Sequence, residues 1–327
     1  MEPLEVWQKV CPYCGFNNSY PQPPDALSTG SILKGKYLVG IVSDLNGFGY
    51  TYIGLDLAAR EKAVIREFFP GGFSRRSPET GKVVIYGHDD YPIEDLRKER
   101  DRYITMAKMQ KEIISPFIAP VKDCFFENNT LYIVRNLVDG VSFRNEMQKS
   151  GGKLHWKRVL RLMMPLLPEI EKIHKKGVFD IRIRPGNLLF YEYNSRGMNS
   201  EKIVLTDLGF FHVYYDPDGD YFLRASFTEP IEMFVSKASR GPYTDVYSIC
   251  ALMYFAITGE KPSFSVDRMI DGGELKFFSS FGLNVPEAVE KAVRHGLEIK
   301  SADRTRTMME LYNELSSALK FDPAVNS

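Results

Sequence analysis

The chain has 327 residues, of which 44% are hydrophobic, and its 42 Lys and Arg residues balance 42 Asp and Glu residues. This length allows two lobes or domains with a well-buried core, and the zero net charge gives no global attraction for nucleic acid or an anionic membrane. The longest apolar run, Ile249 to Ile257, is far shorter than the roughly 20 residues of a membrane-spanning helix. Since no secretory signal begins the chain and four cysteines make no disulfide framework, we expect a cytoplasmic protein without a membrane segment in this chain.

The first 30 residues differ in character from the rest. Cys11 and Cys14, followed by Gly15, have the spacing of one zinc knuckle, and a polar, Pro-rich linker comes next. Tetrahedral zinc needs four ligands, but no second C-x-x-C follows, and Cys124 and Cys250 lie in segments typical of buried cysteines. Two interpretations stay open: a zinc site completed by a second chain or by His or Asp side chains, and a relic knuckle without metal.

The next hundred residues favour β-structure. The runs that we expect to be strands are Leu38–Val42, Tyr50–Gly54, Ala63–Glu67, Val121–Phe126 and Leu131–Val134, because they are β-branched or aromatic and separated by turn residues. Between the third and fourth runs, Glu94–Ile114 carries apolar residues at helical spacing. A strand-rich lobe with one helix is therefore predicted.

After Gly140 the pattern changes to helices. Trp156–His174 predicts a helix with a broad apolar face. Val246–Thr258 is almost wholly apolar, as the central helix of a large helical lobe would be. Val285–Leu297 and Met308–Leu319 are amphipathic. A larger helical lobe thus follows the strand-rich one.

Six motifs occur in the order and spacing typical of one family. They are a glycine-loop-like Asn46–Tyr52, a third-strand-like Ala63–Pro70, a catalytic-loop-like Gly177–Asn187, a metal-binding-like Leu205–Gly209, an A-P-E-like Glu229–Glu232 and a central-helix start at Asp245–Ser248. On these residues the chain from about 31 to 320 resembles the prokaryotic Ser/Thr protein kinases. The resemblance implies an α+β, bilobal protein-kinase-like fold, with a small β-rich N-lobe at 31–137 and a helical C-lobe at 138–327. The zinc-knuckle-like extension and linker occupy 1–30.

The residues that hold this fold together in the family are present. The resemblance implies that Glu232 pairs with a buried arginine late in the chain, for which Arg304 is the match. It also implies that Asp245, at the start of the central helix, holds the backbone of the catalytic loop. Buried ion pairs are costly to break from one side, so we expect the C-lobe to fold in the family way.

Several groups that phosphoryl transfer needs are replaced. The catalytic aspartate of the family lies five residues before the loop asparagine, and here that position holds Arg182, which cannot accept a proton. The alternative base would be Asp180. The third-strand lysine is replaced by Arg66, and its glutamate partner falls at Met106. Only a shifted register would supply Glu99 or Glu112 as a substitute.

The nucleotide-binding features are also altered. In the family's glycine-rich loop the first two glycines become Asp44 and Asn46, and an aspartate there would repel a triphosphate, although Gly49 remains. The alanine that covers the purine in the family becomes Val64, and the resemblance places Arg135 at the position that limits the depth of the purine pocket. We expect these larger side chains to occlude the pocket, so that ATP and Mg²⁺ binding is weak or absent. The alternative is that the Arg135 side chain extends away from the pocket.

Two metal ligands of the family survive, Asn187 and Asp207. They are retained either for structure, through hydrogen bonds within the loop, or as residual metal–nucleotide ligands. The arginines left in the cleft, Arg66, Arg182 and Arg184, raise a second pair of alternatives. They hold an anion or an acidic side chain of this chain or of a partner, or they are neutralised internally by Asp180, Asp207 and Asp44.

These losses imply a degenerate family member of bacterial type, a pseudokinase that acts in signalling as a protein-binding, scaffolding or regulatory module. The alternative is an atypical phosphotransferase that uses Asp207 and Asn187 with metal–ATP and an unorthodox base. We expect a protein partner, for which a second copy of the chain is one candidate, and no nucleic acid. The loop-like tail after Phe321 is compatible with a piece of a longer protein.

Overall fold

The computed structural model describes residues 22–46, 49–86, 92–195, 198–208, 214–215, 221–222, 226–235 and 238–320. The chain divides into two compact units. The first combines Met1–Lys111, Val121–Leu137 and Phe211–Leu223, and the second combines Glu112–Pro120, Val138–Phe210 and Arg224–Ser327. Cys11 and Cys14 lie outside the described residues, so the zinc site stays a prediction.

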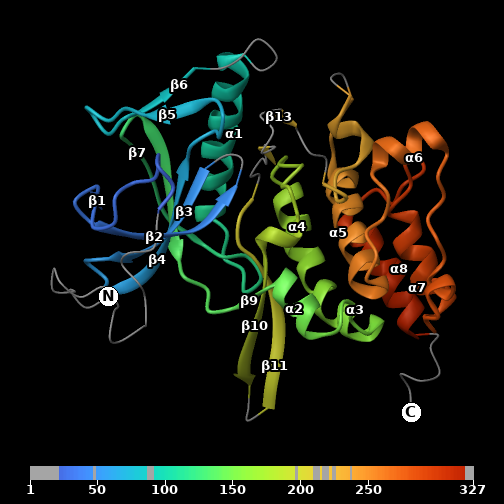
Figure 1. The fold of residues 1–327 in the computed structure, drawn as a ribbon. Coiled ribbons are helices and arrows are strands. Elements are labelled where there is room, and N and C mark those ends of the chain that lie inside the picture. Colours follow the sequence, from blue (N-terminus) through green and yellow to red (C-terminus); the bar gives the residue numbers. More distant parts are fainter. Residues whose placement is uncertain are drawn as a thin grey trace. The chain divides into compact units, whose positions relative to one another are not determined.

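The first unit is built on a six-stranded antiparallel sheet (Figure 1). In spatial order its strands are β1 (Ile32–Leu33), β2 (Tyr37–Asn46), β3 (Gly49–Asp56), β4 (Glu61–Phe68), β8 (Thr130–Asn136) and β7 (Val121–Glu127). Alternate residues of these strands meet in one core, which includes Tyr37, Tyr52, Ile65 and Tyr132. The five strands expected from the sequence are all present.

A helix and a hairpin complete this unit. Helix α1 (Ile93–Lys111) packs on β7 and buries Met106 among its inward-facing residues. It ends three residues earlier than predicted, shortly before Pro116, whose ring disfavours helical backbone in the preceding residue. Between β4 and α1 the chain forms a hairpin that the sequence did not predict, with strands β5 (Ser74–Arg76) and β6 (Val83–Ile85).

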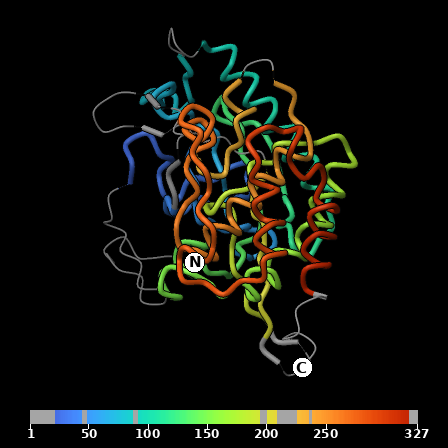
Figure 2. Tube along the Cα trace, turned by 90° about the vertical axis from the view of Figure 1, so that its right-hand side faces the viewer, coloured from blue at the N-terminus to red at the C-terminus, as the bar shows by residue number. Residues whose placement is uncertain are grey.

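The second unit is mostly helical. Its helices are α2 (Phe143–Lys149), α3 (Trp156–Met163), α4 (Leu166–His174), α5 (Pro242–Thr258), α6 (Ser265–Asp271), α7 (Glu287–His295) and α8 (Met308–Lys320), with the short 3₁₀ turns η1 (Pro185–Asn187), η2 (Ile231–Met233) and η3 (Phe278–Phe281). Helices α7 and α8 pack against each other at the red end of the trace (Figure 2). Among the described residues, no helix combines the length and apolar character needed to cross a bilayer.

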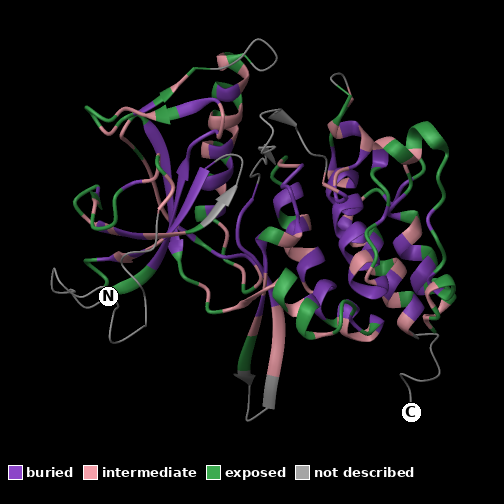
Figure 3. Cartoon of the chain, viewed as in Figure 1, coloured by how far each residue is buried: buried purple, intermediate pink, exposed green. Residues whose placement is uncertain are grey.

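Two details of this unit follow directly from sequence. The single helix predicted for Trp156–His174 is interrupted, because Pro165 lacks the N–H that would continue the α3 ladder into α4. Helix α5 is the buried centre of the unit, as Figure 3 shows along nearly its whole length. It begins with Pro242 in its first turn and is capped at its C-terminal end by Gly259, whose φ of 83° is a left-handed conformation that favours glycine.

A three-stranded sheet lies beside these helices. Strand β10 (Leu188–Ser195) pairs along its length with β11 (Met198–Leu205) and briefly with β9 (Val141–Ser142). Glu201 of β11 binds Arg158 and Arg161 of α3, so one face of the β10–β11 hairpin is fixed to the helices. The catalytic-loop segment leads into β10, and its geometry is therefore set by this sheet and by α5.

Candidate functional site

The backbone of the loop between α4 and η1 is held by the first turn of α5. The carboxylate of Asp245 accepts hydrogen bonds from the N–H groups of Asp180 and Ile181, both at 2.9 Å. Its Oδ2 also lies 3.0 Å from Nε2 of His174. Burial raises the pKa of this carboxyl, against the opposing effect of the bond to His174. The role expected for Asp245 is confirmed by these contacts.

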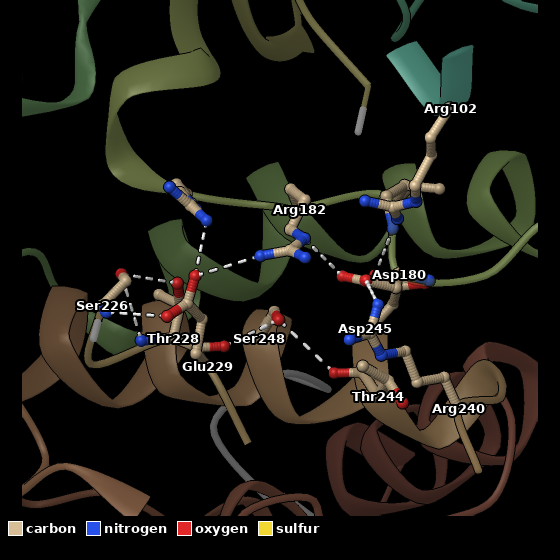
Figure 4. Close-up of polar contacts among 12 residues, drawn as sticks. Arg102, Asp180, Arg182, Ser226, Thr228, Glu229, Arg240, Thr244, Asp245 and Ser248 are labelled. Carbon is tan, nitrogen blue, oxygen red and sulfur yellow. Dashed lines mark hydrogen bonds and ion pairs between the residues drawn. The ribbon is translucent and has the colours of Figure 1, made fainter. Parts of the chain in front are cut away.

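The loop itself has an uncommon backbone. Asp180 and Arg182 are not glycines, yet both have left-handed φ values, of 58° and 59°. Their side chains stabilise the turn, since Oδ1 of Asp180 lies 2.8 Å from Nε of Arg182. The other carboxylate oxygen, Oδ2, lies 2.9 Å from Nη1 of Arg240, which enters from the chain just before α5 (Figure 4).

Arg182 is a buried member of an ion cluster (Figure 4). Its side chain is 3% exposed, and Nη1 lies 3.5 Å from Oε1 of Glu229, in the segment that precedes η2. The same oxygen accepts a short hydrogen bond from Nη2 of Arg184, whose side chain is 7% exposed. The second oxygen of Glu229, Oε2, accepts from the N–H of Ser226 at 3.0 Å. Arg182 and Arg184 are thus paired with carboxylates of their own chain.

This cluster supplies internal acidic partners for Arg182 and Arg184, while binding of an anion from solution or of a partner's acidic side chain stays a prediction. An acidic side chain of the chain itself fills the site, as Asp180 does on one side and Glu229 on the other. The sequence interpretation named Asp180 but missed Glu229. The sequence did carry a signal for it. In the A-P-E-like element Glu229 stands where the family has an uncharged alanine, and such an added charge indicates a partner of opposite charge. The side chain of Asp44 lies outside the described residues.

Asn187 and Asp207 come together in the second unit. The Asn187 amide donates to the carbonyl oxygens of Arg182 and Asp207, at 2.8 and 2.9 Å, and its Oδ1 accepts from the N–H of Arg184 at 2.8 Å. The Asp207 carboxylate accepts from the hydroxyl of Thr206 at 3.1 Å. These bonds give both residues a structural use, while a metal-ligand role stays a prediction. Within the described residues, no group of three or more His, Cys, Asp or Glu side chains could hold a metal ion.

The nucleotide-related positions of the first unit lie on β4 and β8. Val64 is directly opposite Arg135 in the β4–β8 ladder, and Arg66 is opposite Ile133, so these side chains share one face of the sheet. Val64, Arg66 and Arg135 are all buried. Val64 and Arg135 are thus cross-strand neighbours, and occlusion of a purine by them stays a prediction.

Met106, which replaces the glutamate of the family's lysine–glutamate pair, and the two glutamates considered as substitutes lie in different surroundings. Met106 is buried on α1, where a thioether cannot pair with a cation. Glu99 lies on the same helix, with its carboxylate 4.0 Å from Nη1 of Arg102. Glu112 follows the end of α1 and is exposed. A shifted register that would bring either glutamate to Arg66 stays a prediction.

A buried carboxylate that sequence reasoning missed lies next to Arg66. The side chain of Glu67 is fully buried in the core of the first unit, where Nη2 of Arg76 lies 2.7 Å from both carboxylate oxygens. The hydroxyls of Tyr52 and Tyr132 donate to it at 2.8 and 2.5 Å. Arg76 also bonds Asp25, so the network fixes the chain that enters the sheet. Burial raises the pKa of both tyrosines above its usual value.

The pair expected to hold the second unit together is present. Arg304, which is fully buried, binds Glu232 through Nη1 at 2.7 Å and Nη2 at 3.2 Å. Its guanidinium also donates to the carbonyl oxygens of Tyr243, Glu298 and Ile299. These acceptors satisfy most of the N–H donors of the buried guanidinium. The prediction that Glu232 pairs with Arg304 is confirmed.

The sequence model that defines the protein kinase domain family matches residues 90–304 of this chain. The chain belongs to the protein kinase family. Among curated relatives, this kinase-family chain is 24% identical to calcium-dependent protein kinase 7 of Arabidopsis thaliana, over 76% of this chain and 41% of that protein. It is 22% identical to serine/threonine-protein kinase C of a Synechocystis strain, over 71% and 41%. The chain thus spans less than half the length of these relatives.

Solved structures share the bilobal kinase fold with this chain. The structure described as the PpkA-294 apo form has a TM-score of 0.70 and 21% identity, covering 89% of this chain and 99% of that one. The PknI kinase domain of Mycobacterium tuberculosis has a TM-score of 0.62 and 17% identity, covering 90% and 100%. At these identities the likeness establishes the fold, with a β-sheet N-lobe and a helical C-lobe.

Proposed function

We propose that this kinase-family chain is a pseudokinase, which binds protein partners in signalling and does not transfer phosphate. The observation that carries the proposal is Arg182, buried and paired with Asp180 and Glu229 at the position of the family's catalytic aspartate. Phosphoryl transfer needs a carboxylate there to orient the attacking hydroxyl. A guanidinium has five donors and no acceptor, so it cannot take that role.

The neighbouring carboxylate is a poor replacement. Asp180 lies on the same loop, but its two oxygens already contact the guanidinium groups of Arg182 and Arg240. Its N–H is in turn bound by Asp245, which fixes the backbone at this position. A base must reach the proton that it abstracts. The ion pairs of Asp180 with two guanidinium groups of its own chain stabilise its charged form, which makes it a weaker base.

The first unit supports the same proposal. Arg66 replaces the phosphate-binding lysine, and Met106 replaces its glutamate partner on α1. On the same sheet face, Val64 and Arg135 add bulk where the family covers a purine. We infer that ATP binds weakly or not at all. The protein that we propose is cytoplasmic and of bacterial type, with a second copy of the chain among its candidate partners.

The second candidate is an atypical phosphotransferase. It is favoured by one observation, that Asn187 and Asp207 remain together, joined by the hydrogen bond from the Asn187 amide to the Asp207 carbonyl. Metal–ATP held by this pair would still need a base from outside the usual position. The experiment below separates this enzyme from the pseudokinase.

Thermal unfolding of the full chain in the presence of ATP with Mg²⁺ or Mn²⁺ tests the proposal. We expect the melting temperature to rise by less than about 1 °C at millimolar nucleotide, because a ligand that does not bind the native state gives no mass-action stabilisation. The matched variants are Asp207→Ala and, as an exposed carboxylate outside the site, Asp267→Ala. A metal-dependent rise that Asp207→Ala abolishes and Asp267→Ala keeps, together with phosphate transfer to a protein substrate, would favour the phosphotransferase.

A further inference from the structure

The carboxylate of Glu229 lies among donors that converge from two segments of the chain. Its Oε1 contacts the guanidinium groups of Arg182 and Arg184, and its Oε2 accepts from the N–H of Ser226. The Glu229 side chain is only 12% exposed, and those of the two arginines are less exposed still. Figure 4 shows Arg182 on the loop side and Glu229 reaching it from the segment before η2. Glu229 therefore occupies a nearly dry site between two guanidinium groups, one of which also contacts Asp180.

The chemistry of this site suits any oxyanion. Guanidinium groups donate strong, charge-assisted hydrogen bonds to carboxylates and phosphates alike. A backbone N–H that adds to them is a common donor in anion sites. If the carboxylate were absent, two buried cations would lack this partner, which makes the empty site unfavourable. An oxyanion from solution would then be stabilised there.

We propose that Arg182, Arg184 and the Ser226 N–H form an oxyanion-binding site, and that Glu229 is its built-in occupant. The carboxylate is tethered, so its effective concentration keeps free phosphate out of the wild-type site. The ligand class that would compete is a phosphate group, which carries more charge and more acceptor oxygens than a carboxylate. Such a competitor would displace the Glu229 carboxylate from the two arginines and take over the Ser226 N–H as a donor. This site does not depend on whether the chain transfers phosphate.

The segment has other anchors that should survive the loss of the Glu229 side chain. The backbone oxygen of Glu229 accepts from the hydroxyl of Ser265 at 2.8 Å, and the oxygen of Thr228 accepts from Ser248 at 2.7 Å. Three residues on, Glu232 is bound by Arg304. Truncation at Glu229 should therefore leave the backbone in place and open the site to solutes.

The test is phosphate binding by Glu229→Ala in the full chain. We expect the melting temperature of this variant to rise by about 2–3 °C in inorganic phosphate at roughly twenty times its dissociation constant, compared with chloride at equal ionic strength. Wild type should rise by less than about 1 °C, because its own carboxylate fills the site. Titration calorimetry with inorganic phosphate should show one binding site in the variant.

Two controls isolate the arginine site. In Glu229→Ala/Arg184→Met the phosphate-dependent rise should vanish, since the strongest donor is removed. Glu201→Ala is the matched control, because Glu201 is also shared by two arginines, Arg158 and Arg161, whose side chains are 28% and 67% exposed. There water can replace the carboxylate, so phosphate should give no comparable rise.

Three results would overturn the proposal. One is a Glu229→Ala protein that melts at the same temperature in phosphate and chloride. Another is a phosphate-dependent rise in wild type as large as in the variant, which would place the phosphate elsewhere. If Glu229→Ala does not fold in chloride, it should refold in phosphate, because phosphate supplies the missing charge. Failure to refold in phosphate would contradict the site.

Discussion

Arg182→Asp is expected to leave the chain inactive and to lower its free energy of unfolding by about 3–5 kcal/mol, the usual cost of breaking a buried ion pair from one side. The new carboxylate would face Asp180 and Glu229, the two acids that Arg182 now neutralises. Like charges in a nearly dry site repel each other strongly. Urea unfolding at neutral pH measures the loss, and phosphate incorporation with Mg²⁺–ATP measures activity.

Arg182→Met is the control for this substitution, because it removes the charge and keeps much of the side-chain length. Asp180 keeps Arg240 and Glu229 keeps Arg184 in that variant, so the loss should be smaller than for Arg182→Asp. In Arg182→Asp/Glu229→Gln part of the loss should return, as a double-mutant cycle with a non-zero coupling energy. Wild-type stability in Arg182→Asp, or activity above that of Arg182→Met, would show that the site is not closed by these contacts.

Glu67→Gln is expected to destabilise the first unit by about 3–5 kcal/mol, because it leaves the Arg76 guanidinium buried without a charged partner. The side chain of Arg76 is 11% exposed and that of Glu67 is fully buried. The substitution also turns one acceptor oxygen into a donor, which opposes the hydroxyls of Tyr52 and Tyr132. Urea unfolding monitored by tyrosine fluorescence or circular dichroism gives the change.

The matched control is Glu61→Gln, on the same strand. Glu61 is 59% exposed and pairs with Lys122, so its loss should change the free energy of unfolding by less than about 1 kcal/mol. Tyr52→Phe should fall between the two, at about 2 kcal/mol, because it removes the bond that the hydroxyl donates to Glu67 and the one it accepts from the Leu27 N–H, and leaves the ion pair in place. Equal effects of Glu67→Gln and Glu61→Gln would mean that the buried network contributes little.

The parts of the site that sequence predicted are those whose partners have a fixed place in the family. Asp245 contacts the backbone at Asp180, and Glu232 contacts Arg304, as the resemblance implied. The strands were predicted because alternation of apolar side chains is a local signal. The interruption between α3 and α4 is also a local effect, because proline inside a helix removes a backbone hydrogen bond, and Pro165 alone predicts it.

The two carboxylates that sequence missed depend on contacts between distant segments. Glu229 reaches Arg184, 45 residues earlier, and Glu67 reaches Tyr132, 65 residues later. Contacts across such sequence separations leave no repeating pattern of apolar and polar residues in the local sequence. For Glu67 there was one usable signal, since it follows Ala63 and Ile65 at spacing two and so had to face the same core. A charged residue in that pattern indicates a buried partner of opposite charge.

Gly49 has a structural role that does not involve a nucleotide. Its φ of 153° is one that side-chain-bearing residues rarely adopt, and a methyl group there would lie 1.8 Å from the carbonyl oxygen of Glu67. Close approach of β3 to β4 alone therefore requires a glycine at this position. Strand pairing would therefore retain this glycine whether or not a nucleotide binds, and its presence alone is no sign of nucleotide binding.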